Sequence, residues 1–450
     1  MLQKQPWIRT ENDLAIEWEQ AMDEGRDVAY LEDVCRRVAG QAANGGGYGL
    51  AEQLRLALVA APLREGYPYV EPSSLEEIRA ARPARRHNFS RERGALTREA
   101  LRDRVAGAWS GRISGCLLGK PVEGYRLERL LPLLRETGNY PLTRYICRRD
   151  FSGELTERLS LWPDACWADN LQGYSPMDDD TNYTVFALKL VEQYGPDFTC
   201  DDVLEGWLSW LPMFATCTAE RAAYRNAAGG LTAPATATWR NPYREWIGAQ
   251  IRGDFFGYIC PGDPEKAAGL AFRDACVSHV KNGIYGEMFV AAMLAAAAVC
   301  DDVTTVIEAG LDEIPEKSRL RRDVEKVLAW RREGLSARQV MEQIHRCYDE
   351  HSQHGWCHTN SNAMIVTMGL LYGEKDYGAS ICLGVECGFD TDCNGATIGS
   401  IVGMLVGRGA IPACWSQPHN DIIETAVLGC PRLTLSELTG RTLALLQGIC

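Results

Sequence analysis

Two acidic motifs in the sequence have the residue types that bind divalent cations. They are MDDDTN at residues 177–182 and GFDTDCNG at residues 388–395, and each stands just before a helical pattern. One Asp at a helix start is an ordinary cap, because it accepts hydrogen bonds from free backbone N–H groups. Three adjacent carboxylates and a second Asp-x-Asp exceed that need, and hard oxygen ligands favour Mg²⁺, Mn²⁺ or Ca²⁺. We therefore expect one metal site shared between the motifs; capping remains the alternative for either motif alone.

Glycine spacing indicates how the helices near these motifs pack. Glycines recur every four residues at positions 107, 111, 115 and 119, and again at 395, 399, 403 and 407. This spacing places each series along one helix face, where another helix can approach closely. Each glycine costs roughly 1 kcal/mol of helix stability relative to Ala, so we expect tight helix crossing to offset that cost.

The remaining patterns predict an all-α fold. Three-and-four spacing of apolar residues recurs, as at Val185, Leu188 and Val191, whereas alternating runs with tight turns are scarce. The most apolar run, residues 288–300, is too short for the roughly 20 residues of a membrane span and predicts a buried core helix. We therefore expect no membrane partner and at most a minor sheet.

Composition narrows the classes of function and the compartment. The 450 residues include 47 Lys plus Arg against 60 Asp plus Glu, a net charge of −13 that argues against a nucleic-acid partner. The first twenty residues carry charges throughout and resemble no signal peptide, so we expect a cytoplasmic location. Seventeen cysteines without a CxxC pair are interpreted mostly as small buried thiols in a reducing compartment.

Residues 1–95 differ from residues 96–450 and are predicted to form an N-terminal helical extension. Helical patterns cover residues 12–23 and 31–43 and precede a flexible glycine run at 45–47. Residues 71–94 are rich in Pro and Arg, which favours a solvated linker over a site for an anionic ligand or nucleic acid. The sequence leaves open whether the extension caps a cleft, mediates dimerisation or packs on the main domain.

Four segments together resemble the ADP-ribosylglycohydrolase family, which includes the dinitrogenase reductase-activating glycohydrolases. They are GRISGCLLGKPVEG (111–124), MDDDTN, the helical segment 264–297 and GFDTDCNGATIGSIVG (388–403), in the family's order and over roughly residues 100–430. The resemblance implies a compact multi-helix domain with a central cleft that holds two divalent cations, normally Mg²⁺ or Mn²⁺.

The resemblance also assigns metal ligands. Asp179 and Asp180 match the family's paired metal-binding aspartates, and Asp178 stands where the family usually has a Thr or Ser ligand. Asp390 and Asp392 match the second pair.

Three further positions bear on catalysis and on departures from the family. Glu123 matches a glutamate that lies over the site in relatives, and it is the first candidate for the catalytic base, with Asp179 and Asp180 as alternatives. Cys393 replaces a Thr ligand, and a thiol is a poor ligand for Mg²⁺. Cys116 stands where many relatives have an Asp.

Four residues are expected on the substrate side of the cleft: Gly119, Arg252, His279 and Asn394. Arg252 is expected to pair either with a phosphate or with Asp254, and His279 matches a family position near the cleft.

A histidine cluster resembles a zinc ligand set. It comprises His351, His354 and His358 with Cys357, but no second spaced pair accompanies it. Since the segment leads straight into a helix, we expect a loop that lines the cleft.

These parts fit hydrolysis at the anomeric carbon of an ADP-ribosyl group, with two cations holding the ribose cis-diol and orienting a water. The expected partner is an ADP-ribosyl or ribosyl substrate, including ADP-ribosylated protein. A small N-ribosyl compound and a non-catalytic ADP-ribose-binding module remain alternatives. An isoprenoid diphosphate synthase is disfavoured because its D-D-x-x-D spacing fails at Asn182.

Overall fold

The computed structural model describes residues 6–8, 13–43, 46–162 and 165–449. Within them the chain is mostly helical, and its strands are one antiparallel pair, β1 (Ile422–Glu424) and β2 (Arg432–Thr434). The all-α prediction is therefore confirmed.

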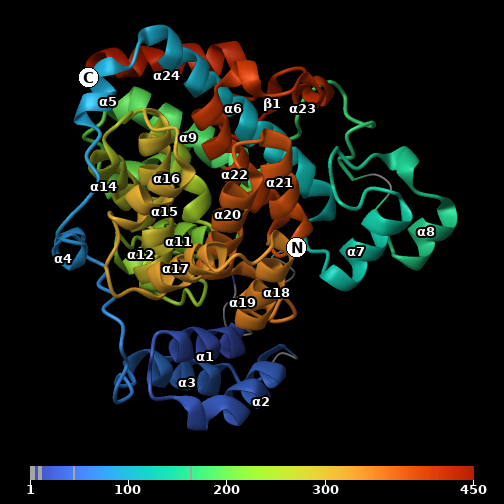
Figure 1. The fold of residues 1–450 in the computed structure, drawn as a ribbon. Helices are drawn as coiled ribbons and strands as arrows, with labels where there is room; N and C mark the ends of the chain where they lie inside the picture. Colours follow the sequence, from blue (N-terminus) through green and yellow to red (C-terminus); the bar gives the residue numbers. More distant parts are fainter. Residues whose placement is uncertain (1–5, 9–12, 44–45, 163–164, 450) are drawn as a thin grey trace.

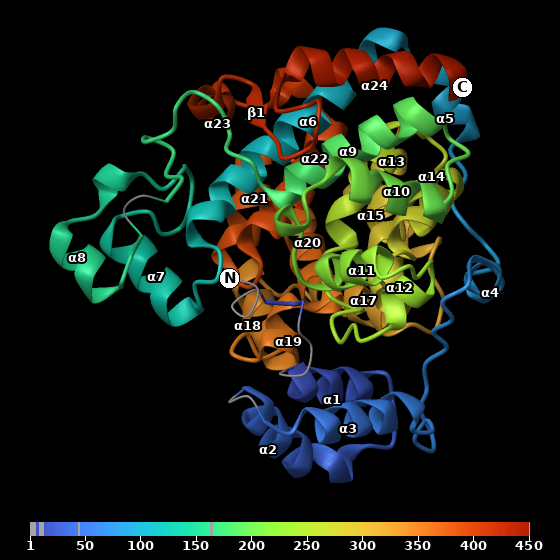
Figure 2. The ribbon, with the colours of Figure 1, turned by 180° about the vertical axis from the view of Figure 1, so that it is seen from behind.

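Helices α6 to α24 form the main body, in which α15, α20 and α22 lie side by side near the middle and α24 crosses one end (Figures 1 and 2). Their bounds are α6 (Arg98–Gly119), α7 (Leu127–Glu136), α8 (Gly153–Arg158), α9 (Asp179–Tyr194), α10 (Cys200–Trp210), α11 (Thr218–Ala228), α12 (Ala235–Thr238), α13 (Asp254–Tyr258), α14 (Pro264–Ala275), α15 (Lys281–Ala297), α16 (Val303–Leu311), α17 (Arg319–Arg332), α18 (Ala337–Cys347), α19 (Gln353–Cys357), α20 (Thr359–Gly373), α21 (Tyr377–Glu386), α22 (Thr391–Val406), α23 (Ala413–Ser416) and α24 (Leu435–Ile449).

Helix α15 is the predicted core helix. All of its residues from Asn282 to Ala297 are buried, so it presents no polar face to solvent. Among the described residues, none of the helices combines the length and the apolar character needed to cross a bilayer.

The two glycine series form one helix crossing. Helices α6 and α22 run antiparallel, so that Gly107 meets Gly403, Gly111 meets Gly399, Gly115 meets Gly395 and Gly119 meets Thr391. At each step a Cβ added to the α6 glycine would overlap the carbonyl oxygen of its partner. The crossing therefore depends on bare backbone, as the four-residue spacing predicts.

A short segment of β structure fixes the start of α9. Ser175 donates its N–H to the carbonyl of Ile422 (2.9 Å) and accepts from the N–H of Glu424 (2.9 Å). One turn into α9, Asn182 Oδ1 accepts from the N–H of Ala426 (2.8 Å). The acidic motif that precedes α9 is thus tied on both sides to residues 422–426.

The N-terminal extension has a small core of its own. It contains α1 (Leu14–Asp23), α2 (Glu32–Ala43) and α3 (Tyr48–Ala60), and α3 is a helix that the sequence analysis missed. Apolar residues of all three helices pack together, among them Leu14, Val38 and Leu58. Of the predicted flexible glycines, Gly45 lies outside the described residues, and Gly47 starts α3 with φ of 71°.

Buried ion pairs hold this extension against the body, on the side of α17 to α19 (Figure 1). Arg244 donates to Glu17 (2.7 Å) and to Glu24 (2.7 Å), and Lys281 pairs with Glu24 (3.0 Å). The carboxylates of Glu17 and Glu24 are both buried. Removing one partner of such a buried pair leaves an uncompensated charge, so the contact holds a defined orientation. The extension therefore packs on the main domain.

The Pro- and Arg-rich stretch runs along the body and contains α4 (Leu75–Ala81) and α5 (Ser90–Ala95). Arg82 pairs with Glu313 and with Glu265 (2.9 Å), and Arg86 pairs with the same two carboxylates (both 3.0 Å). The expectation of a solvated linker is therefore wrong for Arg82, which acidic residues of the body enclose, whereas Arg86 makes its ion pairs at an exposed position.

The helix crossing makes a stability prediction. Replacing Gly111 with Ala places a methyl group against the backbone of Gly399, and we expect a loss of about 3 kcal/mol in the free energy of unfolding. Gly440 lies within α24 and has nothing within 4 Å of an added Cβ, so Gly440→Ala is the matched control, expected to change stability by less than about 1 kcal/mol. Denaturant unfolding of both variants measures the difference, and equal stability would contradict backbone contact between α6 and α22.

Candidate functional site

Three helix ends meet at the candidate site. The C-terminal end of α6 continues into a short 3₁₀ turn, Lys120–Val122, that leads to Glu123. The N-terminal ends of α9 and α22 carry the two acidic motifs, and α6, α9 and α22 lie next to one another in both views (Figures 1 and 2). The positive ends of two helix dipoles therefore point at the carboxylates.

The carboxylates of the two motifs converge in space. Asp180, Asp392 and Cys393 each offer a ligand atom within 4.8 Å of the other two, and so do Glu123, Asp390 and Asp392. A third such group joins Cys116, Asp178 and Asp180. Because Asp180 and Asp392 each belong to two groups, the donors form one continuous cluster.

Three carboxylate oxygens in this cluster have no hydrogen-bond donor. Asp180 Oδ2, Asp390 Oδ1 and Asp392 Oδ1 are buried and lack a partner among the described residues. An unpaired buried oxygen costs free energy unless a donor or a cation satisfies it. The donor set is therefore one that a hard divalent cation fits.

Asp178 differs from its neighbours, because the protein already uses both of its oxygens. One accepts from the Lys120 ammonium and the other from the N–H of Asp180 (2.9 Å), which makes Asp178 the cap of α9. Burial raises its pKa, and the Lys120 charge more than offsets this, so the pKa of Asp178 lies below its ordinary value. Its expected role as a metal ligand therefore competes with capping.

Arg112 is fully buried and holds Asp180 in place. Its guanidinium donates to the carbonyl of Asp180 (2.8 Å) and to Asp180 Oδ1 (3.1 Å), and it pairs with Asp254 (3.0 Å). One oxygen of Asp180 is thereby fixed while the other stays free. Arg112 comes from α6, so the glycine crossing also positions this support.

The remaining carboxyl groups hold their protons more tightly than usual. Burial and the charges of Asp178 and Asp392 raise the pKa of Asp179 to about 7, and burial with the charge of Asp178 raises the pKa of Asp392 to about 6. The pKa of Asp390 lies well above its ordinary value for the same reasons, burial first and then the charge of Asp392. Carboxylates this close repel one another, so without a cation the cluster retains protons.

Glu123 lies at the solvent side of the cluster. Its side chain is exposed, yet the charge of Asp392, and after it desolvation, raises its pKa well above the ordinary value. A carboxyl group with that surrounding charge ionises once positive charge is added nearby, which suits a residue that takes a proton from water.

The two cysteines at departures from the family are protonated thiols. Burial, together with neighbouring aspartates, raises the pKa of both Cys116 and Cys393 well above the usual value for a thiol. A metal-bound cysteine is a thiolate, so these environments oppose ligation by Cys393. Its expected role as a ligand remains a hypothesis.

Asn362 of α20 links the second acidic motif to residues 356–358, which precede α20. The sequence analysis missed this contact. Its Oδ1 accepts from the N–H of Asp390 (3.3 Å) and from Asn394 Nδ2 (2.8 Å). Its Nδ2 donates to the carbonyls of His358 (3.0 Å) and Trp356 (3.1 Å). The amide of Asn362 therefore fixes the backbone at Asp390, and it also turns the predicted substrate residue Asn394 towards itself.

Gly119 and Arg252, both expected to bind substrate, have protein partners. Gly119 packs against the backbone of Thr391, whose hydroxyl donates to its carbonyl (2.9 Å). Arg252 is 1% exposed and donates to Glu220 (2.6 Å) and to Asp274. The expected pairing of Arg252 with Asp254 is wrong, because Arg112 holds Asp254 instead.

His279 is also buried. Its Nδ1 shares a hydrogen bond with the Ser278 hydroxyl (2.7 Å), and Nε2 has no partner among the described residues. Burial and the neighbouring charge of Arg252 hold its pKa well below the usual value, so the ring is neutral. A role in substrate binding stays a hypothesis for His279.

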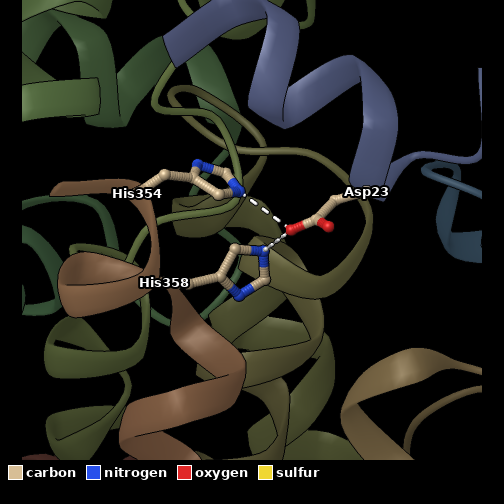
Figure 3. Close-up of side chains that lie close together, drawn as sticks. All are labelled: Asp23, His354 and His358. Carbon is tan, nitrogen blue, oxygen red and sulfur yellow. Dashed lines mark hydrogen bonds and ion pairs between the residues drawn. The ribbon is translucent and has the colours of Figure 1, made fainter. Parts of the chain in front are cut away.

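Two histidines of the cluster, His354 and His358, face the N-terminal extension. Figure 3 shows His354 and His358 both directed at Asp23 of α1, with Nε2 to Oδ2 distances of 2.9 and 3.8 Å. His354 Nδ1 accepts from Trp246 Nε1 (3.0 Å), and His358 Nδ1 accepts from the N–H of Asn360 (3.0 Å). Each ring therefore carries its proton on Nε2, where a zinc ion would need a lone pair. His354 thus joins the extension to the body through a hydrogen bond, whereas His351 lies near Glu128 of α7 (3.7 Å). The expectation of a loop is wrong for residues 353–357, which form helix α19.

Several contributors to the site lay outside the sequence predictions: Arg112, Lys120, Glu220 and Asn362. Arg112 and Lys120 fall within the segment GRISGCLLGKPVEG, where a Lys just after a glycine-rich helix is the one available signal. Asn362 follows the histidine cluster and gives no sign of its partner, which lies 28 residues further on.

Comparisons with known proteins give the family. The family model for ADP-ribosylglycohydrolase matches residues 97–447. A solved structure of an ADP-ribosylglycohydrolase-related protein complex covers 78% of this chain and 99% of its own, with 20% sequence identity and a TM-score of 0.50, which shows a shared fold. A search of curated proteins gives no match. Because the family model spans most of the sequence and includes every helix end that forms the carboxylate site, the chain belongs to the ADP-ribosylglycohydrolase family.

Proposed function

We propose that the protein is a divalent-cation-dependent hydrolase that cleaves the glycosidic bond at the anomeric carbon of an ADP-ribosyl group. Family membership supports a glycohydrolase of this type of substrate. The observation that carries the cation dependence is the set of unpaired buried oxygens on Asp180, Asp390 and Asp392.

The residues proposed to hold two Mg²⁺ or Mn²⁺ ions are Asp179, Asp180, Asp390 and Asp392. The donor chemistry favours hard cations over soft ones, since each donor is a carboxylate and the nearby thiols are protonated. When bound, such ions bind the ribose hydroxyls and lower the pKa of a water. Their charge would also counteract the burial and the repulsion from Asp178 and Asp392 that together raise the pKa of Asp179 to about 7.

Glu123 is proposed as the base, because it is the carboxyl group of the cluster that lies towards solvent. Its backbone follows the α6 crossing and the 3₁₀ turn, so its position relative to Asp392 is set by packed helices. Deprotonated, it takes a proton from the attacking water while the glycosidic bond breaks through an oxocarbenium-like state. The water oxygen bonds to the anomeric carbon from one face, and the leaving group departs with the bonding electron pair and gains a proton from solvent.

The three candidate substrate classes differ in their leaving group. Protein-linked ADP-ribose, free ADP-ribose derivatives and small N-ribosyl compounds share the cis-diol that the site is proposed to bind. We favour an ADP-ribosyl substrate because the family match covers all the helix ends of the site.

The proposal predicts loss of turnover when one unpaired oxygen is removed. Asp390→Asn replaces a carboxylate of the cluster with a neutral amide, and we expect the rate to fall by at least about a hundredfold, as it should when EDTA removes the cations. The measurement is release of ADP-ribose or ribose from arginine-linked and serine-linked ADP-ribosyl protein and from small ribosyl compounds.

Asp376→Asn is the control, since Asp376 caps α21 at an exposed position and should keep near full activity. Turnover that persists in EDTA, or at full rate in Asp390→Asn, would contradict the proposal. Release of ribose from small compounds alone would assign the second substrate class, and cation binding without any turnover would indicate a binding module.

Asn362 makes a second prediction for the same site. Asn362→Ala removes the acceptor for the N–H of Asp390, so we expect Mn²⁺ affinity to fall about tenfold or more while the carboxylates remain. Asn360→Ala is the matched control, because its amide donates to Asp323 (3.3 Å) instead. Titration calorimetry with Mn²⁺ on both variants gives the comparison. Equal affinities would mean that Asn362 does not position the site.

A further inference from the structure

Two cysteines from different helices meet away from the carboxylate cluster. Cys200 is the first residue of α10 and is partly exposed, whereas Cys276 directly follows α14 and is buried. Their sulfur atoms lie 2.9 Å apart, although the residues are 76 positions apart in the sequence. A disulfide has a sulfur–sulfur distance of about 2.05 Å, so a small side-chain adjustment brings this pair to bonding distance.

The two thiols have different surroundings. Cys200 sits in the first turn of α10, where the helix dipole favours negative charge, and its hydrogen bond with Cys276 lowers its pKa. The same hydrogen bond, together with burial, raises the pKa of Cys276 well above the usual range. The nearby carboxylates of Asp201 and Asp274 act against ionisation of Cys200 but do not reverse the direction.

We propose that Cys200 and Cys276 are a redox-active pair that forms a reversible disulfide, with Cys200 as the attacking thiol. The thiolate of Cys200 attacks one sulfur of a low-molecular-weight disulfide and releases one small thiolate. Cys276 then loses its proton and attacks the sulfur of Cys200, which releases the second small thiol. In balance, two protein thiols are oxidised to one disulfide while one small disulfide is reduced to two thiols.

The disulfide would restrain residues 274–278, the segment that binds Arg252. Cys276 lies between Asp274 and Ser278, and both of these residues bind the buried guanidinium of Arg252. Oxidation would tie the start of α10 to this segment, and closing a long loop stabilises the folded chain. The proposal is independent of the hydrolase activity, because it concerns thiol chemistry alone.

The test is oxidation of the full chain by oxidised glutathione, followed by acid quenching, alkylation of the remaining thiols and peptide mass spectrometry. We expect one disulfide between the peptides of Cys200 and Cys276, reversed by dithiothreitol. The oxidised protein should unfold at a temperature higher by roughly 3 °C. Cys200→Ser and Cys276→Ser should each lose both effects, whereas Cys300→Ser should keep them, since Cys300 is a partly exposed cysteine in another loop.

Full alkylation of Cys200 and Cys276 after glutathione treatment would overturn the proposal. So would a disulfide of either residue with a different cysteine, or a rise in unfolding temperature on oxidation that Cys200→Ser retains. If a serine variant fails to fold, alkylation of the wild-type chain still tests the proposal. The free thiols of Cys200 and Cys276 must then be lost at the same rate during oxidation.

Discussion

The direct backbone contact between α6 and α22 determines where the charged groups of the candidate site lie. Glycines of one helix face glycines of the other at three successive positions, and Gly119 meets the backbone of Thr391 at the end that forms the candidate site. Because no side chain separates the helices, the segment that leads to Glu123 reaches the carboxylates at the start of α22. The same helix also supplies Arg112, which holds one oxygen of Asp180.

Burying this many carboxylates close together lowers the free energy of unfolding, and nearby positive groups offset part of that loss. Lys120 pairs with Asp178, Arg112 pairs with one oxygen of Asp180 although burial still raises the pKa of that carboxyl group, and two helix N-termini face the cluster. The compensation is incomplete, since the pKa values of Asp179, Asp390 and Asp392 are raised and three oxygens stay without a donor. Local charge and hydrogen bonding are left unsatisfied at the carboxylate cluster, which is the expected pattern for a functional site.

Sequence reasoning succeeded where the signal is periodic or local. The four-residue glycine spacing predicts the helix crossing, and the apolar run at residues 288–300 predicts the core helix α15. It failed where partners are distant in sequence. Arg252 is held by Glu220 and Asp274. In the Pro- and Arg-rich stretch, Arg82 and Arg86 pair with acidic residues more than 170 positions away. Two histidines of the apparent zinc set, His354 and His358, contact Asp23, and the direction of their hydrogen bonds becomes visible only with Trp246 and Asn360 in place.

The central claim is that Asp180, Asp390 and Asp392, with Glu123 beside them, form a site for divalent cations. Crystals grown with Mn²⁺ and measured at a wavelength with strong manganese anomalous scattering test it most directly. The account predicts anomalous peaks between the N-terminal ends of α9 and α22, within ligand distance of the unpaired oxygens of these aspartates. Well-ordered carboxylates without an anomalous peak at millimolar Mn²⁺, or peaks confined to other parts of the molecule, would contradict it.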